Sequence, residues 1–536
     1  ILAHYHIRTF AHSHICTFTM QPLFVIIILA LMVLALIKDR MRPGLIMFSG
    51  AVVFLCAGIL TPKELLEGFA NKGMITVAML FLVSEGVRRS GLLEALLRSL
   101  LPLKSHTAVR KVQARMLPTI AFISAFLNNT PVVVIFAPMI KRWAEKHGVA
   151  ATKLLIPLSY ATILGGTCTL IGTSTNLVVH GMVIDAGFEG FSMFELGKVG
   201  IIIALVGLLY IWIFSPRLLP AERNNKDEIT SPSELGHGLH RIEVVLGARF
   251  PAINRRIIDF DFKRKYGADL LELKRGGETF IVHDMRRERF HEGDTLVLLA
   301  NDDFMQNWGD SSFFLMVSNG KDQDFKMPRW KCWLSVILLV LMIIGATVGE
   351  LPAVREAAPR MHLDMFFFVS VVTILMAWLN IFPARKYTKF ISWDILITIA
   401  SAFAISRAML NSGMADCVAQ WAVGLSSQYS PIVLLAVIFI ITNLFTELMT
   451  NNAAAALAFP LSLSIAQHMG VSPMPFFVTI CMAASASFST PIGYQTNLIV
   501  QGVGNYRFAD FVKVGLPLNI ISLVVTVTVV PYFWPF

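Results

Sequence analysis

Two polar stretches interrupt otherwise apolar sequence, and both contain the glycine, threonine and asparagine residues that suit the binding of small ions. The first runs from Thr169 to Gly181 and the second from Thr490 to Gly502. A shift of 321 positions superposes them without a gap, pairing Thr169 with Thr490, Gly172 with Gly493, Asn176 with Asn497 and Gly181 with Gly502. Two halves of one chain that share a helix-breaking stretch inside apolar segments are the pattern of a secondary transporter.

Each break has a polar companion upstream. Asn128-Asn129-Thr130 precedes the first break and Thr450-Asn451-Asn452 precedes the second, and a shift of 322 positions pairs Asn129 with Asn451. A single asparagine in a membrane helix often serves only as a hydrogen-bonding contact between helices. Two clusters in register across an internal repeat favour a functional role instead. All six residues of the two clusters are therefore candidate functional residues, and the family resemblance described below implies that they bind the substrate.

The expected chemistry follows from helices that stop inside a bilayer, because their terminal N–H and carbonyl groups must find partners. Helix N-termini attract an anion, whereas carbonyl ends attract a small cation. A hard cation such as sodium prefers an all-oxygen shell, which backbone carbonyls, hydroxyls and amide side chains supply. We predict two cation sites flanking one anion site, with cation ligands drawn from Asn129, Gly172, Thr173, Asn176, Asn451, Thr490, Gly493 and Asn497.

Glu447 is the candidate for ion coupling, because it lies three residues before Thr450 in an otherwise apolar segment. A carboxylate inside a membrane is costly and marks a functional position. Two roles stay open, namely neutralising a bound cation and pairing with a backbone donor at the helix end. Arg407 is a second charge within an apolar segment, for which ion pairing or snorkelling is favoured over contact with a substrate.

Composition defines the class of protein. Of 536 residues, 55% are hydrophobic and only 15% are charged, with a mean hydropathy of +0.65. These values indicate a polytopic membrane protein of the cell (inner or plasma) membrane, in contact with the lipid bilayer. The net charge of +10 does not indicate nucleic-acid binding. The charged stretch 216–330 holds 18 basic and 19 acidic residues, and the basic excess lies among the apolar segments, where it marks cytoplasmic loops.

The apolar segments predict an all-α membrane fold made of two repeats. Spans are expected at about 22–38, 43–60, 73–99, 152–184 and 198–215, and again at about 331–350, 361–383, 391–424, 474–504 and 514–533. Two interrupted segments, 113–147 and 430–468, are interpreted as re-entrant hairpins. This interpretation leaves about five crossings per half, inverts the second half, and gathers the basic loops on one face, the cytoplasm. The expected divisions are a tail at 1–20, repeats at 21–216 and 329–536, and an insert at 217–328.

The insert is predicted to be a small cytoplasmic α+β domain. A strand is expected at Arg241–Gly247, and a hairpin is expected over Ala268–His283 with its turn at Gly276-Gly277. A further strand is expected at Glu292–Ala300.

At these residues the sequence resembles the divalent anion:sodium symporter family, solute-carrier family thirteen of the ion transporter superfamily. The two asparagine clusters resemble the family's paired Ser-Asn-Thr motifs, Thr446-Glu447 matches its Thr-Glu lead-in, and Thr490-Pro491 through Asn497 matches its later break. Asparagine replaces serine in the first motif, and Ser174-Thr175 replaces the proline pair of the first break. The insert at 241–306 resembles one C-terminal lobe of potassium-conductance regulators (TrkA-C type), a combination similar to the sulfate-associated branch.

The resemblance implies a homodimeric, elevator-type symporter rather than an enzyme. Its coupling ion is sodium, and its substrate is a small divalent oxyanion, sulfate first. The alternatives are a dicarboxylate such as succinate, sodium/proton exchange through Glu447, and a non-transporting membrane sensor. The inserted domain is expected to bind an unidentified small ligand that adjusts the transport rate.

Overall fold

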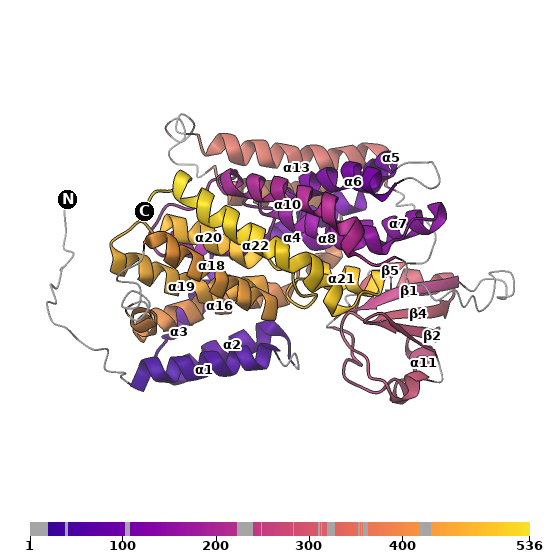
Figure 1. Cartoon of the computed structure of the whole chain (residues 1–536), viewed down its shortest axis with the longest axis horizontal. Helices are drawn as coiled ribbons and strands as arrows, with labels where there is room; N and C mark the ends of the chain where they lie inside the picture. The colour runs from indigo at the N-terminus through magenta and orange to yellow at the C-terminus, as the bar shows by residue number, and fades with distance from the viewer. Residues whose placement is uncertain are drawn as a thin grey trace.

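The structure combines a bundle of helices with a small β-sheet domain at one end (Figure 1). The computed structural model describes residues 20–37, 41–101, 108–221, 240–247, 249–281, 284–308, 311, 313–318, 327–351, 354, 356, 363–418, 420 and 430–536. Except for Met20, the predicted N-terminal tail lies outside these residues.

The helices of the first half follow the predicted apolar segments. They are α1 (Met20–Ile37), α2 (Pro43–Cys56), α3 (Pro62–Glu67), α4 (Lys72–Arg89), α5 (Leu92–Leu100), α6 (Val109–Ser124), α7 (Asn129–His147), α8 (Thr152–Gly166), α9 (Ser174–Asp185) and α10 (Gly197–Leu218). The single spans expected at 73–99, 152–184 and 474–504 are wrong in detail, because each is two helices. The polar breaks divide 152–184 into α8 and α9, and 474–504 into α20 (Met474–Ser485) and α21 (Gln495–Gly504). Gly91, at φ 67°, separates α4 from α5, and this left-handed conformation favours glycine.

The second half contains α13 (Arg329–Gly349), α15 (Met365–Trp378), α16 (Trp393–Asn411), α18 (Pro431–Leu448), α19 (Asn451–Met469), α20 (Met474–Ser485), α21 (Gln495–Gly504) and α22 (Phe508–Phe533). The series α18–α22 follows the same order as α6–α10, with breaks at equivalent places. Each interrupted segment is a pair of helices, α6 with α7 and α18 with α19. Inversion of the two halves across a bilayer stays a prediction.

Long apolar helices with exposed apolar side chains make this an integral membrane protein. Among the described residues, six helical segments are long and apolar enough to cross a membrane. They are Pro62–Arg89, which runs from α3 through α4, and Gly197–Leu218, Arg329–Gly349, Trp393–Asn411, Pro431–Leu448 and Phe508–Phe533. Three of them expose Leu205, Leu341 and Ile520 by more than half. Such side chains suit contact with lipid tails rather than water.

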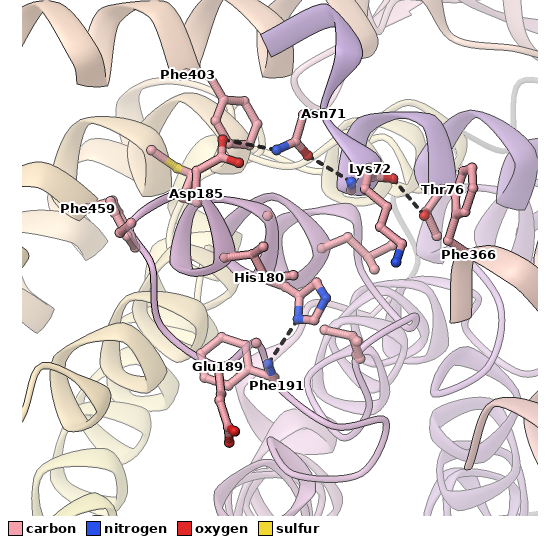
Figure 2. Close-up of a pocket in the computed structure, with 18 of the residues that line it drawn as sticks. Asn71, Lys72, Thr76, His180, Asp185, Glu189, Phe191, Phe366, Phe403 and Phe459 are labelled. Carbon is pink, nitrogen blue, oxygen red and sulfur yellow. Dashed lines mark hydrogen bonds between the residues drawn. The ribbon is translucent and has the colours of Figure 1, made fainter. Parts of the chain in front are cut away.

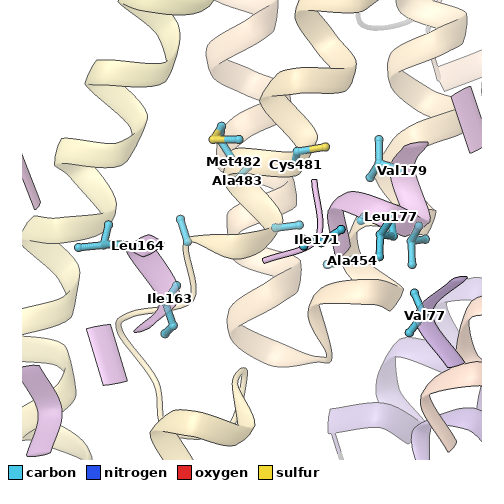
Figure 3. Packing of buried hydrophobic residues seen from close by; sticks show 14 of the residues in the cluster. Val77, Ile163, Leu164, Ile171, Leu177, Val179, Ala454, Cys481, Met482 and Ala483 are labelled. Atoms are coloured by element: carbon cyan, nitrogen blue, oxygen red, sulfur yellow. The ribbon is translucent and has the colours of Figure 1, made fainter. Parts of the chain in front are cut away.

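The interior holds both breaks in place. Figure 3 shows buried side chains from α4, α8, α9, α19 and α20 packed around the first break, with Val77, Ile171, Leu177 and Ala454 among them. Small residues line α19 next to its N-terminus, where Ala453 to Ala456 are all buried. Small side chains let helices approach closely in a membrane protein, where apolar contact alone gives little preference for helix over lipid.

The insert forms a five-stranded antiparallel sheet, whose strands are β1 (His240–Leu246), β2 (Ala268–Arg275), β3 (Glu278–Ile281), β4 (Thr295–Ala300) and β5 (Phe314–Ser318), in the order β3-β2-β4-β1-β5. The predicted strands are confirmed, and so is the hairpin turn, where Gly276 and Gly277 both have positive φ, as a tight turn requires. Short helices α11 (Phe262–Tyr266) and α12 (Asp302–Trp308) complete the domain.

The insert packs directly against α7 and α21 (Figure 1). The Lys141 ammonium of α7 lies 2.6 Å from the Glu243 carboxylate of β1, which also pairs with Lys274 at 3.0 Å. The Gly277 N–H of the hairpin turn donates to Asn505 Oδ1, just beyond α21, at 2.8 Å. The insert therefore contacts two helices whose opposite ends carry the candidate site.

Candidate substrate and ion site

The two breaks share one pattern of local hydrogen bonds. In the first break the Gly172 N–H donates to Thr169 Oγ1 at 3.1 Å, and Asn176 Nδ2 donates to the Thr169 carbonyl at 2.9 Å. In the second break Gly493 donates to Thr490 Oγ1 at 3.3 Å, and Asn497 donates to the Thr490 carbonyl at 3.1 Å. The sequence repeat is therefore a structural repeat, because equivalent threonine, glycine and asparagine residues close equivalent loops.

The glycines of the breaks are required by close packing. A Cβ at Gly172 would lie 2.5 Å from the Gly166 carbonyl oxygen, and a Cβ at Gly493 would lie 2.3 Å from the Thr446 carbonyl oxygen. These distances are far below van der Waals contact, so a side chain would push the breaks away from α8 and α18.

The equivalent asparagines Asn176 and Asn497 differ in the hydrogen bonding of their side-chain oxygens. The Asn176 and Asn497 side chains are both fully buried. Asn497 Oδ1 accepts from the Ser159 hydroxyl at 2.7 Å, whereas Asn176 Oδ1 has no partner among the described residues. Thr496 Oγ1, at the equivalent of Thr175, is also buried and without a partner in the part of the chain that the structure describes. Buried unsatisfied oxygens are rare and require an explanation, and a bound cation is one explanation.

Glu447 closes the second break. Its two carboxylate oxygens each accept a backbone N–H at 2.8 Å, one from Ser489 and one from Thr490. Asn519 Nδ2 of α22 donates to the same carboxylate at 2.7 Å. Two roles were open from the sequence, neutralising a bound cation and pairing with a backbone donor. These contacts correspond to the second role.

The asparagine clusters begin α7 and α19 and are tied to the preceding helices. Thr446 Oγ1 donates to Asn451 Oδ1 at 2.8 Å, and Ser124, the equivalent of Thr446, contacts Asn129 at 2.7 Å. In the amide orientation that satisfies its surroundings, Asn129 Nδ2 donates to Ser124 Oγ at 2.7 Å, so the direction of this bond is the reverse of that at Asn451. The same nitrogen also donates to the Thr162 and Gly172 carbonyl oxygens at 3.1 and 3.2 Å.

Each break also reaches the asparagine cluster of the other half. Thr175 Oγ1 of the first break donates to Asn452 Oδ1 at 3.1 Å, with Ser174 Oγ 3.3 Å from the same oxygen. Thr130 Oγ1 donates to Gln495 Oε1 of the second break at 3.3 Å. These contacts bring together the N-termini of α7, α9, α19 and α21.

The remaining predicted residues lie at the same junction. Thr173 Oγ1 lies 3.3 Å from the hydroxyl of Tyr494. Asn128 and Thr450 are the N-cap residues of α7 and α19, and neither side chain caps its helix. Asn128 borders a small pocket that it shares with Ser174. The structure thus brings all thirteen predicted residues to the two breaks and the cluster ends. Sequence reasoning did not single out Tyr494 and Gln495, which stand where the first break has Thr173 and Ser174.

A cavity of about 750 Å³ opens beside the first break, between α4, α9 and α16 (Figure 2). Asn71 caps α4 by accepting from Gly73 at 2.8 Å and donates to Asp185 at 3.1 Å, and His180 Nδ1 accepts from the Phe191 N–H at 2.9 Å. Leu177 lines both this cavity and the small pocket beside Asn128.

Acidic side chains dominate the cavity wall: Glu64, Glu67, Asp185, Glu189, Glu195, Glu350 and Asp364. The basic residues of the wall are paired, Lys72 with Asp364, and Arg407 with Glu64 at 3.5 Å. The pairing interpretation of Arg407 is therefore confirmed. This cavity could not be predicted from the sequence, because its wall comes from separate helices.

Charge also governs the contact between insert and bundle. Burial alone would raise the pKa of Glu243, but the ammonium groups of Lys141 and Lys274 hold this pKa well below its usual range. The carboxylate is therefore charged at neutral pH and fastens β1 to α7.

No group of three or more His, Cys, Asp or Glu residues that could hold a metal ion exists among the described residues. Any cation at the breaks would rely on amide, hydroxyl and backbone oxygens, a donor set that suits sodium better than a transition metal.

A polytopic helical protein with paired helix breaks is, by fold and site, a membrane transport protein. The family model CitMHS, described as "Citrate transporter", matches residues 24–461 and 360–535. The chain therefore belongs to this citrate transporter family, and the resemblance to divalent anion:sodium symporters is confirmed at the level of this superfamily.

Relatives agree with this assignment. An "Uncharacterized transporter sll0640" of Synechocystis is 28% identical over 89% of this chain and 91% of its own. "Probable sodium/sulfate cotransporter 3" of Chlamydomonas reinhardtii is 36% identical, over 41% of this chain and 24% of its own. The "Sodium-dependent dicarboxylate transporter SdcS" of Staphylococcus saprophyticus is 22% identical over 89% of this chain and 79% of its own. These names describe transporters rather than enzymes.

Among solved structures, the YdaH transporter of Alcanivorax borkumensis is similar with a TM-score of 0.48 and 13% identity. The similarity covers 88% of this chain and 87% of the other.

Proposed function

We propose that this protein is a sodium-coupled symporter of a small divalent oxyanion, with sulfate as the substrate. One observation carries the proposal: the N-termini of α7, α9, α19 and α21 meet through hydrogen bonds between the two halves. A helix N-terminus presents free N–H groups and the positive end of the helix dipole, so four of them favour an oxyanion without an arginine clamp.

The substrate-binding residues are Asn128, Asn129, Thr130, Thr450, Asn451 and Asn452. Their side chains are neutral donors and acceptors that can follow the tetrahedral oxygens of sulfate. The relative named as a sodium/sulfate cotransporter supports this substrate.

Sodium binds at the two breaks in this proposal. The unpartnered oxygens of Asn176 and Thr496 supply acceptors for a cation, one in each break. Backbone oxygens near Gly172, Thr173, Thr490 and Gly493 would complete the shells, with Asn129, Asn451 and Asn497 holding the loops. A bound cation would also lower the cost of placing a divalent anion beside it.

A dicarboxylate is the second candidate substrate, favoured by the family's description as citrate transporters and by the relative named as a dicarboxylate transporter. Sodium/proton exchange is disfavoured, because Glu447 is held by three donors at 2.7 to 2.8 Å. A proton carrier must release such contacts in every cycle. A sensor that binds without transport is separated from these by measuring flux.

The proposal also covers the movement of the site, the oligomeric state and the insert. The site moves by an elevator mechanism within a homodimer, and the insert lies on the cytoplasmic face with a small ligand that adjusts transport. Deletion of residues 225–322 tests the insert: unchanged kinetics with every ligand tried would refute regulation.

Uptake of radiolabelled sulfate into liposomes tests the function, with an inward sodium gradient, an inward potassium gradient or none, and succinate as competitor. Asn129→Ala and Asn451→Ala probe the clusters, but both side chains also hold the breaks. Thr130→Val is the sharper variant, because Thr130 is a proposed substrate ligand whose hydroxyl bonds, among the described residues, to Gln495 alone. Thr347→Val is its matched control, since Thr347 donates only within α13, to the Ile343 carbonyl.

Sodium-driven sulfate flux that falls in Thr130→Val and not in Thr347→Val is the expected result. Sodium-driven succinate flux without sulfate flux would keep the mechanism and overturn the substrate. Flux of neither anion would return the exchanger and sensor to consideration.

A further inference from the structure

Tyr494 breaks the symmetry of the site. The shift that superposes the two breaks places it on Thr173, a much smaller residue. Tyr494 is the N-cap residue of α21, with an extended backbone of φ −132° and ψ 128°. Its side chain leaves the second break and reaches the first half, where the hydroxyl contacts Asn129 and lies 3.3 Å from Thr173 Oγ1.

The Tyr494 hydroxyl also interacts with the Asn451 side chain. It therefore contacts the equivalent asparagines of both clusters, Asn129 and Asn451, where the helix N-termini meet. An anion bound at these N-termini would therefore lie next to the phenol.

Tyr160 and Tyr506 are tyrosines with a structural role, and they differ from Tyr494 in burial and in hydrogen-bond partners. The Tyr160 hydroxyl donates to the Phe488 carbonyl, and the Tyr506 hydroxyl donates to the Thr152 carbonyl. Both side chains are fully buried and satisfied by main-chain oxygens. Tyr494, in contrast, is only partly buried and contacts side chains of the candidate site.

We infer that Tyr494 determines which anions the site accepts, by filling space that a longer carboxylate would need and by hydrogen bonding to the residues that bind the oxyanion. This inference rests on the proposed function. We expect a compact tetrahedral anion to be accommodated beside the phenol, whereas succinate or citrate would need the volume of the ring. Apart from Gln495, the side chains that meet at the four helix N-termini are short Ser, Thr and Asn side chains, so the ring is the largest side chain among them.

Binding measurements test the inference without requiring transport. Thermal stabilisation of the purified full-length protein is recorded in sodium with sulfate, oxalate, malonate, succinate and citrate, since a ligand stabilises in proportion to the logarithm of its concentration over Kd. The variants are Tyr494→Phe, Tyr494→Leu and Tyr494→Thr, the last restoring the residue of the first break. Tyr210→Phe is the matched control, because Tyr210 donates to the Val514 carbonyl away from the site.

Tyr494→Phe is expected to keep the size limit and to weaken sulfate binding roughly 5- to 10-fold, the effect of one lost hydrogen bond. Tyr494→Thr and Tyr494→Leu are expected to shift the ratio of succinate to sulfate affinity at least tenfold toward succinate, an estimate on the order of 1.4 kcal/mol of relieved steric exclusion. If Tyr494→Thr does not fold, Tyr494→Leu carries the comparison.

The outcomes separate this inference from the proposed function. Wild-type preference for sulfate with an unchanged ratio in the folded variants would overturn the role of Tyr494 alone. Wild-type preference for succinate, with a shift toward citrate in the variants, would overturn sulfate and support Tyr494. No stabilisation of the wild type by any anion would refute both.

Discussion

Replacing Glu447 by glutamine tests whether this carboxylate is a structural clamp or a proton carrier. The carboxylate accepts from the Ser489 N–H, the Thr490 N–H and Asn519 Nδ2, all at 2.7 to 2.8 Å. Hydrogen bonds to a charged group contribute about 1.5 to 3 kcal/mol each. A glutamine keeps one acceptor oxygen but turns its NH₂ group toward a backbone donor. We therefore expect Glu447→Gln to cost about 2 to 5 kcal/mol.

The assay is thermal unfolding of the purified protein together with the pH dependence of flux. An entropy of about 2.1 cal/mol/K per residue converts this cost into a fall of roughly 2 to 5 °C in Tm. Glu67→Gln is the control, because Glu67 is exposed on the cavity rim. A clamp predicts lower stability and lower flux at every pH. An unchanged Tm, with loss only of pH-coupled exchange, would refute the clamp and restore the exchanger.

Three further predictions follow from the breaks and from the insert. Glu243→Gln leaves Lys141 without its partner and should cost about 2 to 4 kcal/mol. The pKa of Glu243 is lowered in the folded protein. The difference in Tm between the wild type and Glu243→Gln should therefore be constant above about pH 5 and shrink in more acidic solution. A difference in Tm that does not depend on pH would contradict this. Thr496→Val should raise the sodium concentration for half-maximal uptake severalfold. Thr526→Val is its control, because it also removes a hydroxyl that has no partner among the described residues, and it should leave this concentration unchanged. Equal effects of the two variants would exclude a cation role for Thr496. Gly502→Ala places a Cβ 2.7 Å from the Gly293 carbonyl oxygen, so it should loosen the insert and raise the rate of limited proteolysis there, and an unchanged cleavage pattern would argue against tight docking.

Much of the fold could be predicted because it depends on local pattern. Apolar length located the helices, and the paired glycines of the insert located its hairpin turn. The repeat located both breaks, since the threonine, glycine and asparagine that close each loop are neighbours in sequence. The strand β5 was not predicted, because it is only five residues long.

Contacts between distant segments could not be predicted. Glu447 meets Asn519 across 72 positions, and Tyr494 meets Asn129 across 365 positions. No periodicity records such pairs, because they depend on how the helices pack. The signal for Tyr494 was present only as a departure from the repeat. The docking of Glu243 on Lys141 likewise joins an insert to a helix 102 positions away.

The docking of the insert has a thermodynamic consequence. At about 1.5 Å per residue, α7 spans roughly 18 Å between Asn129 at the site and Lys141 at the insert, and α21 links its own end of the site to Asn505 over a similar length. A ligand of the insert that favours one position of these helices would change the affinity for the transported anion by some factor. Linkage then requires the anion to change the affinity for that ligand by the same factor. The insert would then report on the occupancy of the membrane site, and a cell could sense the anion through the same protein that transports it.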